Sequence, residues 1–329
     1  DQTYLRGYAS FTEETLRKQI KTKETVGDKT VGKTVWEDLF EQNGLPRDAC
    51  KGVAGFWYDT KNQTPIFMPT NRGILIPNRN EFGQIIGGQI RVDEASMKYS
   101  AEVNDIWKDK ARVVIKYVGN GQYHYTIYMY PDYDVYSEAT TPKKHLTFEN
   151  GLSFKIKSSA KYVWLSTSSK EYGCGAKNVP HYAFPDLVLA QARFDNNGNG
   201  LVNLVELCQS VIVTEGLLKG DIIATQVPNT RLERLGSTLV ISMAGVNSWK
   251  QVAYHLKTKT TFARVFLAFD SDFKENDAVY NYLKQIIEYI HQQDKNKQVS
   301  VFTWEVGKGL DDFLLSKEAM TLTVKAHKF

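Results

Sequence analysis

The feature that most constrains this fold is the regular alternation of apolar and amphipathic segments after residue 207. Strand-like runs are expected at 210–214, 238–242, 264–269 and 298–303, and helical segments at 217–226, 248–257, 275–293 and from Asp311 onward. Strands that alternate with helices form a parallel sheet with right-handed crossovers. The sequence therefore predicts an α/β unit over residues 207–329, with about four parallel strands flanked by helices.

The chain before residue 207 has a different pattern and is expected to form two further regions. Residues 1–50 are polar and predict a helical N-terminal segment, with helices beginning near Thr12 and over Trp36–Gln42. Residues 51–206 predict a basic, mixed α+β subdomain. Its marker is a hairpin in which two strand-like runs flank a turn at Asn80–Gly83.

Residues 97–160 are expected to be an insertion in this subdomain. A second hairpin pattern runs over 113–118 and 123–128 and is closed by Gly119-Asn120-Gly121, which favours a tight turn. The tyrosines of this hairpin either stack on nucleic-acid bases or are ordinary strand residues.

Composition limits the class of protein. Hydrophobic residues make up 42% of the chain, and the net charge of +4 is compatible with a polyanionic partner. The three cysteines are far apart, so neither a zinc site nor a disulfide framework is expected. No apolar run is long enough to span a membrane. We expect a cytoplasmic protein with no membrane partner.

Acidic residues follow two of the expected strands. Glu215 comes directly after the run 210–214, and Asp270 and Asp272 follow the run 264–269. Residues two apart in an extended segment point to the same side, and function in parallel sheets gathers at the carboxyl ends of the strands. Converging carboxylates favour a hard cation, Mg²⁺ or Mn²⁺. The alternative is that each acid caps the helix that follows it.

These acidic segments resemble the TOPRIM domain. In that domain one strand is followed by Glu-Gly, and a later strand is followed by Asp-x-Asp. Upstream, the run from Arg72 to Arg79 and the run from Gly83 to Arg91 are similar to a hairpin of bacterial DNA primases. The segments at Lys161-Tyr162, at Val213–Asp221 and at Lys308–Asp312 resemble later primase segments. The resemblance covers roughly residues 70–95 and 160–315 and indicates a primase-like protein of a plasmid, phage or other mobile element.

The resemblance implies a role for each matching position. Glu215, Asp270 and Asp272 would be the catalytic, metal-binding residues, with Asp312 supporting the metal. Template phosphate or nucleoside triphosphate would be held by Arg72, Arg79, Arg91, Lys161, Lys219 and Lys308. Single-stranded DNA and nucleoside triphosphates would be the partners, with a replicative helicase as a further one. The implied reaction is RNA primer synthesis.

Two departures keep other functions open. Ser271 stands where active primases usually carry glycine, and the primase zinc-binding domain is absent from these residues. The same carboxylates would serve a metal-dependent nuclease, and a non-catalytic nucleic-acid-binding or docking module is the third alternative.

Two further segments fit the sequence patterns of known binding motifs. The segment Gly27–Thr34 fits the Walker A pattern, but no buried strand precedes it, so a Gly/Lys/Thr loop is the preferred interpretation. Asp195, Asn197, Asn199 and Glu206 fit a weak calcium loop, or else an Asn/Gly-rich turn. The isolated histidines His124, His145 and His181 are expected to be strand or loop residues.

Overall fold

The chain forms two compact units that interleave along the sequence. The computed structural model describes residues 6–11, 20–26, 29–67, 72–194, 202–245, 248–271, 276–320 and 324–328. Unit 1 comprises Asp1–Ala9, Ile76–Gly88 and Gly175–Phe329, and unit 2 comprises Ser10–Leu75 and Gln89–Cys174. The compact units therefore do not follow the consecutive order of the three predicted domains.

Unit 1 is built on a six-stranded sheet of order β15-β17-β16-β18-β19-β20. Its strands are β15 (His181–Ala183), β16 (Ser210–Glu215), β17 (Thr238–Met243), β18 (Arg264–Ala268), β19 (Gln298–Thr303) and β20 (Lys325–Lys328). The four central strands are parallel, and β15 and β20 pair with their neighbours in the antiparallel sense. The sequence predicted the four parallel strands but not the two edge strands.

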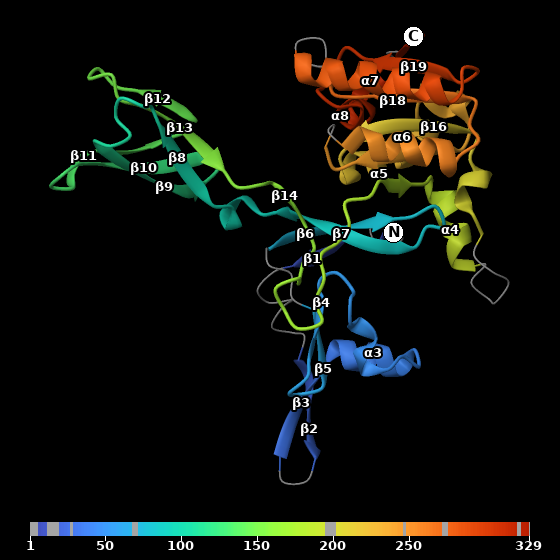
Figure 1. Cartoon of the computed structure of the whole chain (residues 1–329), viewed down its shortest axis with the longest axis horizontal. Coiled ribbons are helices and arrows are strands. Elements are labelled where there is room, and N and C mark those ends of the chain that lie inside the picture. The colour runs from blue at the N-terminus through green and yellow to red at the C-terminus, as the bar shows by residue number, and fades with distance from the viewer. Residues whose placement is uncertain are drawn as a thin grey trace. The chain divides into compact units, whose positions relative to one another are not determined.

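Helices lie on both faces of this sheet (Figure 1). They are α4 (Asp186–Phe194), α5 (Leu217–Gln226), α6 (Trp249–Thr258), α7 (Asp277–Gln293) and α8 (Leu310–Leu315), with 3₁₀ turns at Leu204–Leu207, Val227–Asn229, Arg231–Leu235 and Lys317–Met320. The helices expected after each parallel strand are present.

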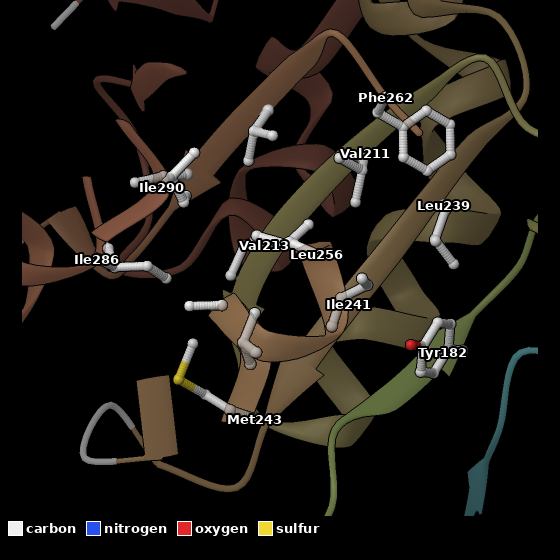
Figure 2. Packing of buried hydrophobic residues seen from close by; sticks show 14 of the residues in the cluster. Tyr182, Val211, Val213, Leu239, Ile241, Met243, Leu256, Phe262, Ile286 and Ile290 are labelled. Carbon is white, nitrogen blue, oxygen red and sulfur yellow. The ribbon is translucent and has the colours of Figure 1, made fainter. Parts of the chain in front are cut away.

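The strand residues alternate between two buried clusters, as the period of a β-strand requires. Val211 and Val213 of β16 pack with α6 and α7 on one face, whereas Ile212 packs with α5 and α8 on the other. Figure 2 shows the first cluster, in which Val211, Leu239 and Ile241 lie with Leu256 of α6 and Ile286 and Ile290 of α7. Because both faces are covered, the parallel strands are apolar almost throughout.

The hairpin predicted around Asn80–Gly83 is present as β6 (Gly73–Arg79) and β7 (Ile85–Val92), with its turn at Asn80–Gly83. The backbone N–H of Gly83 donates to the carbonyl of Asn80, which closes the turn. These strands lie in a sheet of order β1-β6-β7-β14, completed by β1 (Ala9–Phe11) and β14 (Tyr162–Trp164).

The N-terminal part of unit 2 corrects the prediction of a mainly helical segment over residues 1–50. Ile20–Val26 and Lys29–Thr34 form the antiparallel strands β2 and β3, and among the described residues of this segment the α-helix is α3 (Val35–Gln42). Threonine and valine are frequent in both strands, and β-branched residues favour strands over helices. The expected helix near Thr12 lies outside the described residues.

The Walker A match falls on this hairpin. Its second half, Lys29–Thr34, is strand β3 rather than the expected loop, so these residues do not form a phosphate-cradling loop. Helix α3 begins directly afterwards because Thr34 and Glu37 form a reciprocal capping box. Unit 2 continues through a 3₁₀ turn at Arg47–Cys50 and a hairpin of β4 (Phe56–Asp59) and β5 (Thr64–Phe67).

The insertion is an all-β part of unit 2. A 3₁₀ turn at Glu94–Ser96 precedes it, and its strands are β8 (Tyr99–Val103), β9 (Ala111–Gly119), β10 (Gln122–Met129), β11 (Asp134–Thr141), β12 (His145–Thr147) and β13 (Ser153–Ser158). They form two three-stranded sheets that enclose one apolar core. The turn between β9 and β10 has positive φ at Asn120 and Gly121, as its sequence predicts.

The tyrosines of β10 belong largely to the core of the insertion. Tyr123 and Tyr125 are buried, which favours the interpretation of strand residues over exposed stacking platforms. Across the described part of the chain, no helix is both long and apolar enough to cross a membrane.

Candidate functional site

The candidate site lies where three adjacent parallel strands of unit 1 end. Strand β16 connects to β17 on one side, and the chain then continues at β18 on the other side of β16. The order of the strands therefore reverses between β16 and β18, and ligands bind at such a switch point, outside the carboxyl ends of the strands. Glu215 ends β16, and Asp270 follows β18.

The two strand ends are held together locally. Thr214 of β16 is paired in register with Ala268 of β18, and the Thr214 hydroxyl donates to the Ala268 carbonyl at 2.8 Å. Gly216 follows with φ of 87°, a conformation that glycine adopts without strain, and the chain turns there into α5. Glu215 is half-buried at this turn.

Lys219, in the first turn of α5, is the central cation of the site. Its Nζ lies 2.5 Å from Asp270 Oδ1. Burial by itself lowers the pKa of Lys219, but the hydrogen bond and charge of Asp270, with the charges of Asp311 and Glu215, outweigh it and raise that pKa. Three carboxylates from three different segments thus act on one ammonium group.

Asp311 is a site residue that the sequence analysis did not select. It is buried at the start of α8, the helix after β19, and its Oδ1 has no hydrogen-bond partner among the described residues. Burial raises the pKa of Asp311, opposed by the charge of Lys219. An added Cβ at Gly309 would lie 2.1 Å from this oxygen. Glycine there leaves room for the carboxylate beside the backbone.

Asp312, which the resemblance assigned to metal support, has another role in this structure. Its side chain is exposed, and its Oδ2 accepts a hydrogen bond from the backbone N–H of Gly309 at 3.2 Å. It caps α8 as the third residue of that helix. The capping-box spacing was the signal that could have distinguished the two acids, because it places Asp312 at the cap and leaves Asp311 for the site.

The loop after β19 is joined to the loop after β18. The Ser271 N–H donates to the carbonyl of Lys308 at 2.8 Å, and the Ser271 hydroxyl donates to the carbonyl of Gly307. Lys308 Nζ lies 3.5 Å from Asp270 Oδ2, with 63% of its side chain exposed. Both predicted lysines, Lys219 and Lys308, therefore contact the carboxylate site.

The predicted trio of metal ligands is only partly covered by the structure. Asp272 lies outside the described residues. Within the described ranges, no three His, Cys, Asp or Glu side chains are grouped closely enough to hold a metal ion. The chemistry of the donors is of the kind that Mg²⁺ or Mn²⁺ prefers, because the site offers carboxylate oxygens, and one of them, the buried Oδ1 of Asp311, has no hydrogen-bond partner among the described residues.

The predicted phosphate-binding bases fall into different environments. Arg79 is only 6% exposed, and its guanidinium donates to the carbonyls of Gly83 and Arg6. In this structure Arg79 therefore satisfies backbone oxygens inside unit 1. Its contact with phosphate stays a prediction. Arg72, Arg91 and Lys161 are exposed in unit 2, and the last two line one pocket.

A buried ionic network centres on Asp221 of α5, within the segment that resembles primases. Its carboxylate accepts hydrogen bonds from Arg6 at 2.6 Å and Tyr8 at 2.5 Å, and lies 3.2 Å from His181 Nε2. Burial opposes the charged form, but His181, Arg6 and Tyr8 lower the pKa of Asp221 to about 2. His181 was expected to be a strand or loop residue, and it lies in strand β15. Its side chain also contacts Asp221.

The calcium-loop match is largely outside the described residues, which exclude Asp195, Asn197 and Asn199. Glu206 lies in the 3₁₀ turn Leu204–Leu207 and accepts from Asn203 Nδ2 at 3.3 Å. The other two histidines are in strands of the insertion, His124 in β10 beside Glu138 and His145 in β12.

Comparison with known proteins places one match on this part of the chain. Residues 206–321 match the family described as a domain of unknown function (DUF3854). A search of curated proteins found no match, and a search of solved structures found none. The matched segment contains the four parallel strands and all of the described site residues, Glu215, Lys219, Asp270, Lys308 and Asp311.

Proposed function

We propose that this chain is a primase-like nucleotidyltransferase that synthesises RNA primers on single-stranded DNA in the replication of a plasmid, phage or other mobile element. The proposal assigns the parallel β/α part of unit 1 to the TOPRIM type. One observation carries it: Glu215, Asp270 and Asp311 follow three adjacent parallel strands and act on a single cationic position.

The proposed metal is Mg²⁺ or Mn²⁺, with Glu215, Asp270 and Asp272 as its ligands and Asp311 as a further carboxylate of the site. When bound, the metal supplies a Lewis acid that neutralises charge on the phosphoryl oxygens. Lys219 and Lys308 are the nearby cations. Lys308 is exposed enough to contact an incoming phosphate, where a lysine acts as a point charge. Positioning and charge neutralisation account for most of the catalysis in phosphoryl transfer.

A second candidate, a nucleic-acid-binding module without polymerisation, is favoured by the ion pair between Lys219 and Asp270. In that case the ammonium would neutralise the carboxylates permanently, in the place of a metal. The two candidates differ in one measurable respect: the module would bind DNA with no dependence on divalent metal and would form no new phosphodiester bond.

The test is primer synthesis by the full chain on mixed single-stranded templates, with labelled ribonucleotides and Mg²⁺ or Mn²⁺. We expect short labelled products that disappear in Asp270→Asn. Glu288→Gln is the matched control, because Glu288 is an exposed acid on α7 of the same unit, away from the strand ends. It should make wild-type amounts of product.

Two results would overturn the proposal. Binding of DNA without product by the folded wild-type chain would favour the binding module. Metal-dependent loss of labelled DNA without synthesis would favour a nuclease, which would use the same carboxylates with water as the nucleophile.

A further inference from the structure

A pocket in unit 2 lies between the base of the β6–β7 hairpin and the insertion. Its volume is about 380 Å³, within the usual range for small-ligand sites. The hairpin side contributes Ile74, Arg91, Val92 and Asp93, and Lys161 follows from the segment before β14. The insertion contributes the opposite wall, including Tyr99, Tyr123 and Lys144.

The cations of this pocket have no acidic partners of their own. Arg91, Lys144 and Lys161 are exposed, and within the described ranges none of them forms an ion pair. Lys144 Nζ lies 5.9 Å from the centre of the Tyr123 ring. Asp93 and Glu94 also line the pocket, so the three cations exceed the acids by one. A ligand with two or more negative charges would complement this arrangement.

The walls of the pocket are fixed by backbone and side-chain hydrogen bonds. The Val92 N–H donates to the carbonyl of Lys161 at 2.9 Å, and Tyr162, the next residue, pairs with Arg91, so Arg91 and Lys161 lie close together in the backbone. The Tyr117 hydroxyl donates to Glu94 Oε2 at 2.6 Å, which holds that carboxylate against the insertion. The backbone that carries Arg91 and Lys161 is therefore held in place by the fold.

Several residues that line the pocket are aromatic or apolar. Tyr99 is half-buried, lies edge-on to Tyr123 with ring centroids 5.3 Å apart, and stacks on Tyr117. Ile74 and Met97 complete this surface. Aromatic and apolar lining residues suit a planar base, while the cations of the lining suit phosphate.

We propose that this pocket binds one phosphorylated nucleoside, with the base on the Tyr99 side and the phosphate against Arg91, Lys144 and Lys161. The ligand is either a free nucleoside triphosphate or one nucleotide of a single strand, since both present the same chemistry. The choice of a nucleotide over other phosphorylated molecules rests on the proposed function. The insertion thus contributes directly to substrate binding, through Tyr99 and Lys144.

The experiment measures equilibrium binding to the full chain in EDTA, so that no metal-dependent chemistry contributes. One arm uses labelled ATP, and the other uses a labelled oligothymidylate. Lys144→Ala should weaken binding about tenfold, the loss of one charge-assisted phosphate contact, and Lys144→Arg should retain it. Lys116→Ala is the matched control, because Lys116 is an exposed lysine on β9 in the same insertion that does not line the pocket.

A loss confined to ATP identifies a free nucleotide as the ligand, and a loss confined to the oligonucleotide identifies a nucleotide within a strand. Equal affinity of Lys144→Ala and Lys116→Ala for both probes, or no binding of either probe by the wild type, would overturn the inference. The binding measured in EDTA is separate from the proposed function, which is tested by primer synthesis: binding that depends on Lys144 in a wild type that makes no primer would support this inference and overturn the proposed function.

Discussion

Lys219 explains how carboxylates from three segments coexist at the strand ends of unit 1. Without a cation, the acidic side chains would repel one another or take up protons. The ammonium of Lys219 is close enough to Asp270 for a direct ion pair and feels the charges of Asp311 and Glu215. The half-buried lysine thus compensates the carboxylates in the absence of a divalent cation.

Asp221 is a second carboxylate whose charge is balanced by neighbouring groups. It is almost completely buried and stabilises the fold. An unpaired charge at 3% exposure would be strongly destabilising. Arg6, His181 and Tyr8 supply its partners, and burial together with the Asp221 carboxylate raises the pKa of Tyr8, so that its hydroxyl stays protonated and donates. The network therefore links an N-terminal residue to α5.

We predict that Asp221→Asn lowers the free energy of unfolding by about 3 kcal/mol at neutral pH, because Arg6 and His181 lose a buried partner. Asp221 has a folded pKa of about 2, below the ordinary value of an unfolded aspartate. Its stabilisation is present above about pH 4 and is lost as the pH falls toward 2. The measurement is denaturant unfolding of the wild type and the variant at several pH values. The difference between their free energies of unfolding gives the stabilisation by Asp221.

The control for this experiment is Asp48→Asn, which removes an exposed carboxylate whose partner is Lys51. Surface pairs contribute little, so this variant should follow the wild type at every pH. A constant difference between wild type and Asp221→Asn from pH 7 to pH 2 would show that the charge of Asp221 is not what stabilises the fold.

Individual residues show where prediction from sequence was limited. The position of Glu215 and Asp270 at the ends of strands followed from the β/α pattern, whereas the adjacency of those two strands came from the structure. The burial of Arg79 did not, because it depends on contacts with the carbonyls of Gly83 and Arg6 that no local pattern encodes. The choice between Asp311 and Asp312 likewise depended on which acid caps α8.

Among the elements, the turn from β19 into α8 has the most direct effect on the site. Gly309 is the N-cap of α8, with backbone angles that any residue can adopt. The space beside it is filled by the Asp311 carboxylate, and Lys219 Nζ would lie 3.3 Å from an added Cβ. This glycine is therefore required by the close approach of the side chains, and not by the conformation of the backbone.

We predict that Gly309→Ala displaces the Asp311 carboxylate and weakens metal binding while the chain stays folded. The measurement is the rise in melting temperature on adding Mn²⁺, which should be much smaller than in the wild type because the stabilisation depends on affinity. Gly87→Ala is the control, since its Cβ would meet only Ala176 at an ordinary 3.4 Å. An unchanged Mn²⁺ effect in Gly309→Ala would exclude Asp311 from the metal site.

The elements also divide into those that sequence could and could not predict. Helices α5, α6 and α7 and the four parallel strands were expected within a few residues, because their apolar periodicity is strong. The β2–β3 hairpin was missed, since its strands are polar and rich in lysine and threonine. The edge strands β15 and β20 have few residues and gain their stability from pairing with β17 and β19.

At the scale of the whole molecule, the compact units are discontinuous in sequence. Unit 1 combines the parallel sheet with Asp1–Ala9 and the hairpin segment Ile76–Gly88. Sequence patterns report local periodicity, whereas these associations depend on contacts between distant residues, such as Lys259 with Glu81 at 2.7 Å. The family match to residues 206–321 covers only the continuous part of this unit.

We predict that residues 207–329 expressed alone are less stable than the full chain. The fragment lacks Arg6, Tyr8 and His181, so Asp221 loses the hydrogen-bond partners that the structure shows. Thermal unfolding followed by circular dichroism should show a lower and broader transition. A fragment that unfolds at the temperature of the full chain would mean that the N-terminal contacts do not stabilise the sheet.

The central claim is that the carboxylates at the ends of β16, β18 and β19 bind a divalent metal. The most direct measurement is a Mn²⁺ titration of the full chain, with free Mn²⁺ followed by electron paramagnetic resonance. We predict saturable binding that weakens about tenfold or more in both Asp270→Asn and Asp311→Asn, from the loss of a charged ligand, and stays unchanged in Glu288→Gln. Equal binding by all four proteins, or no binding by the wild type, would contradict the claim.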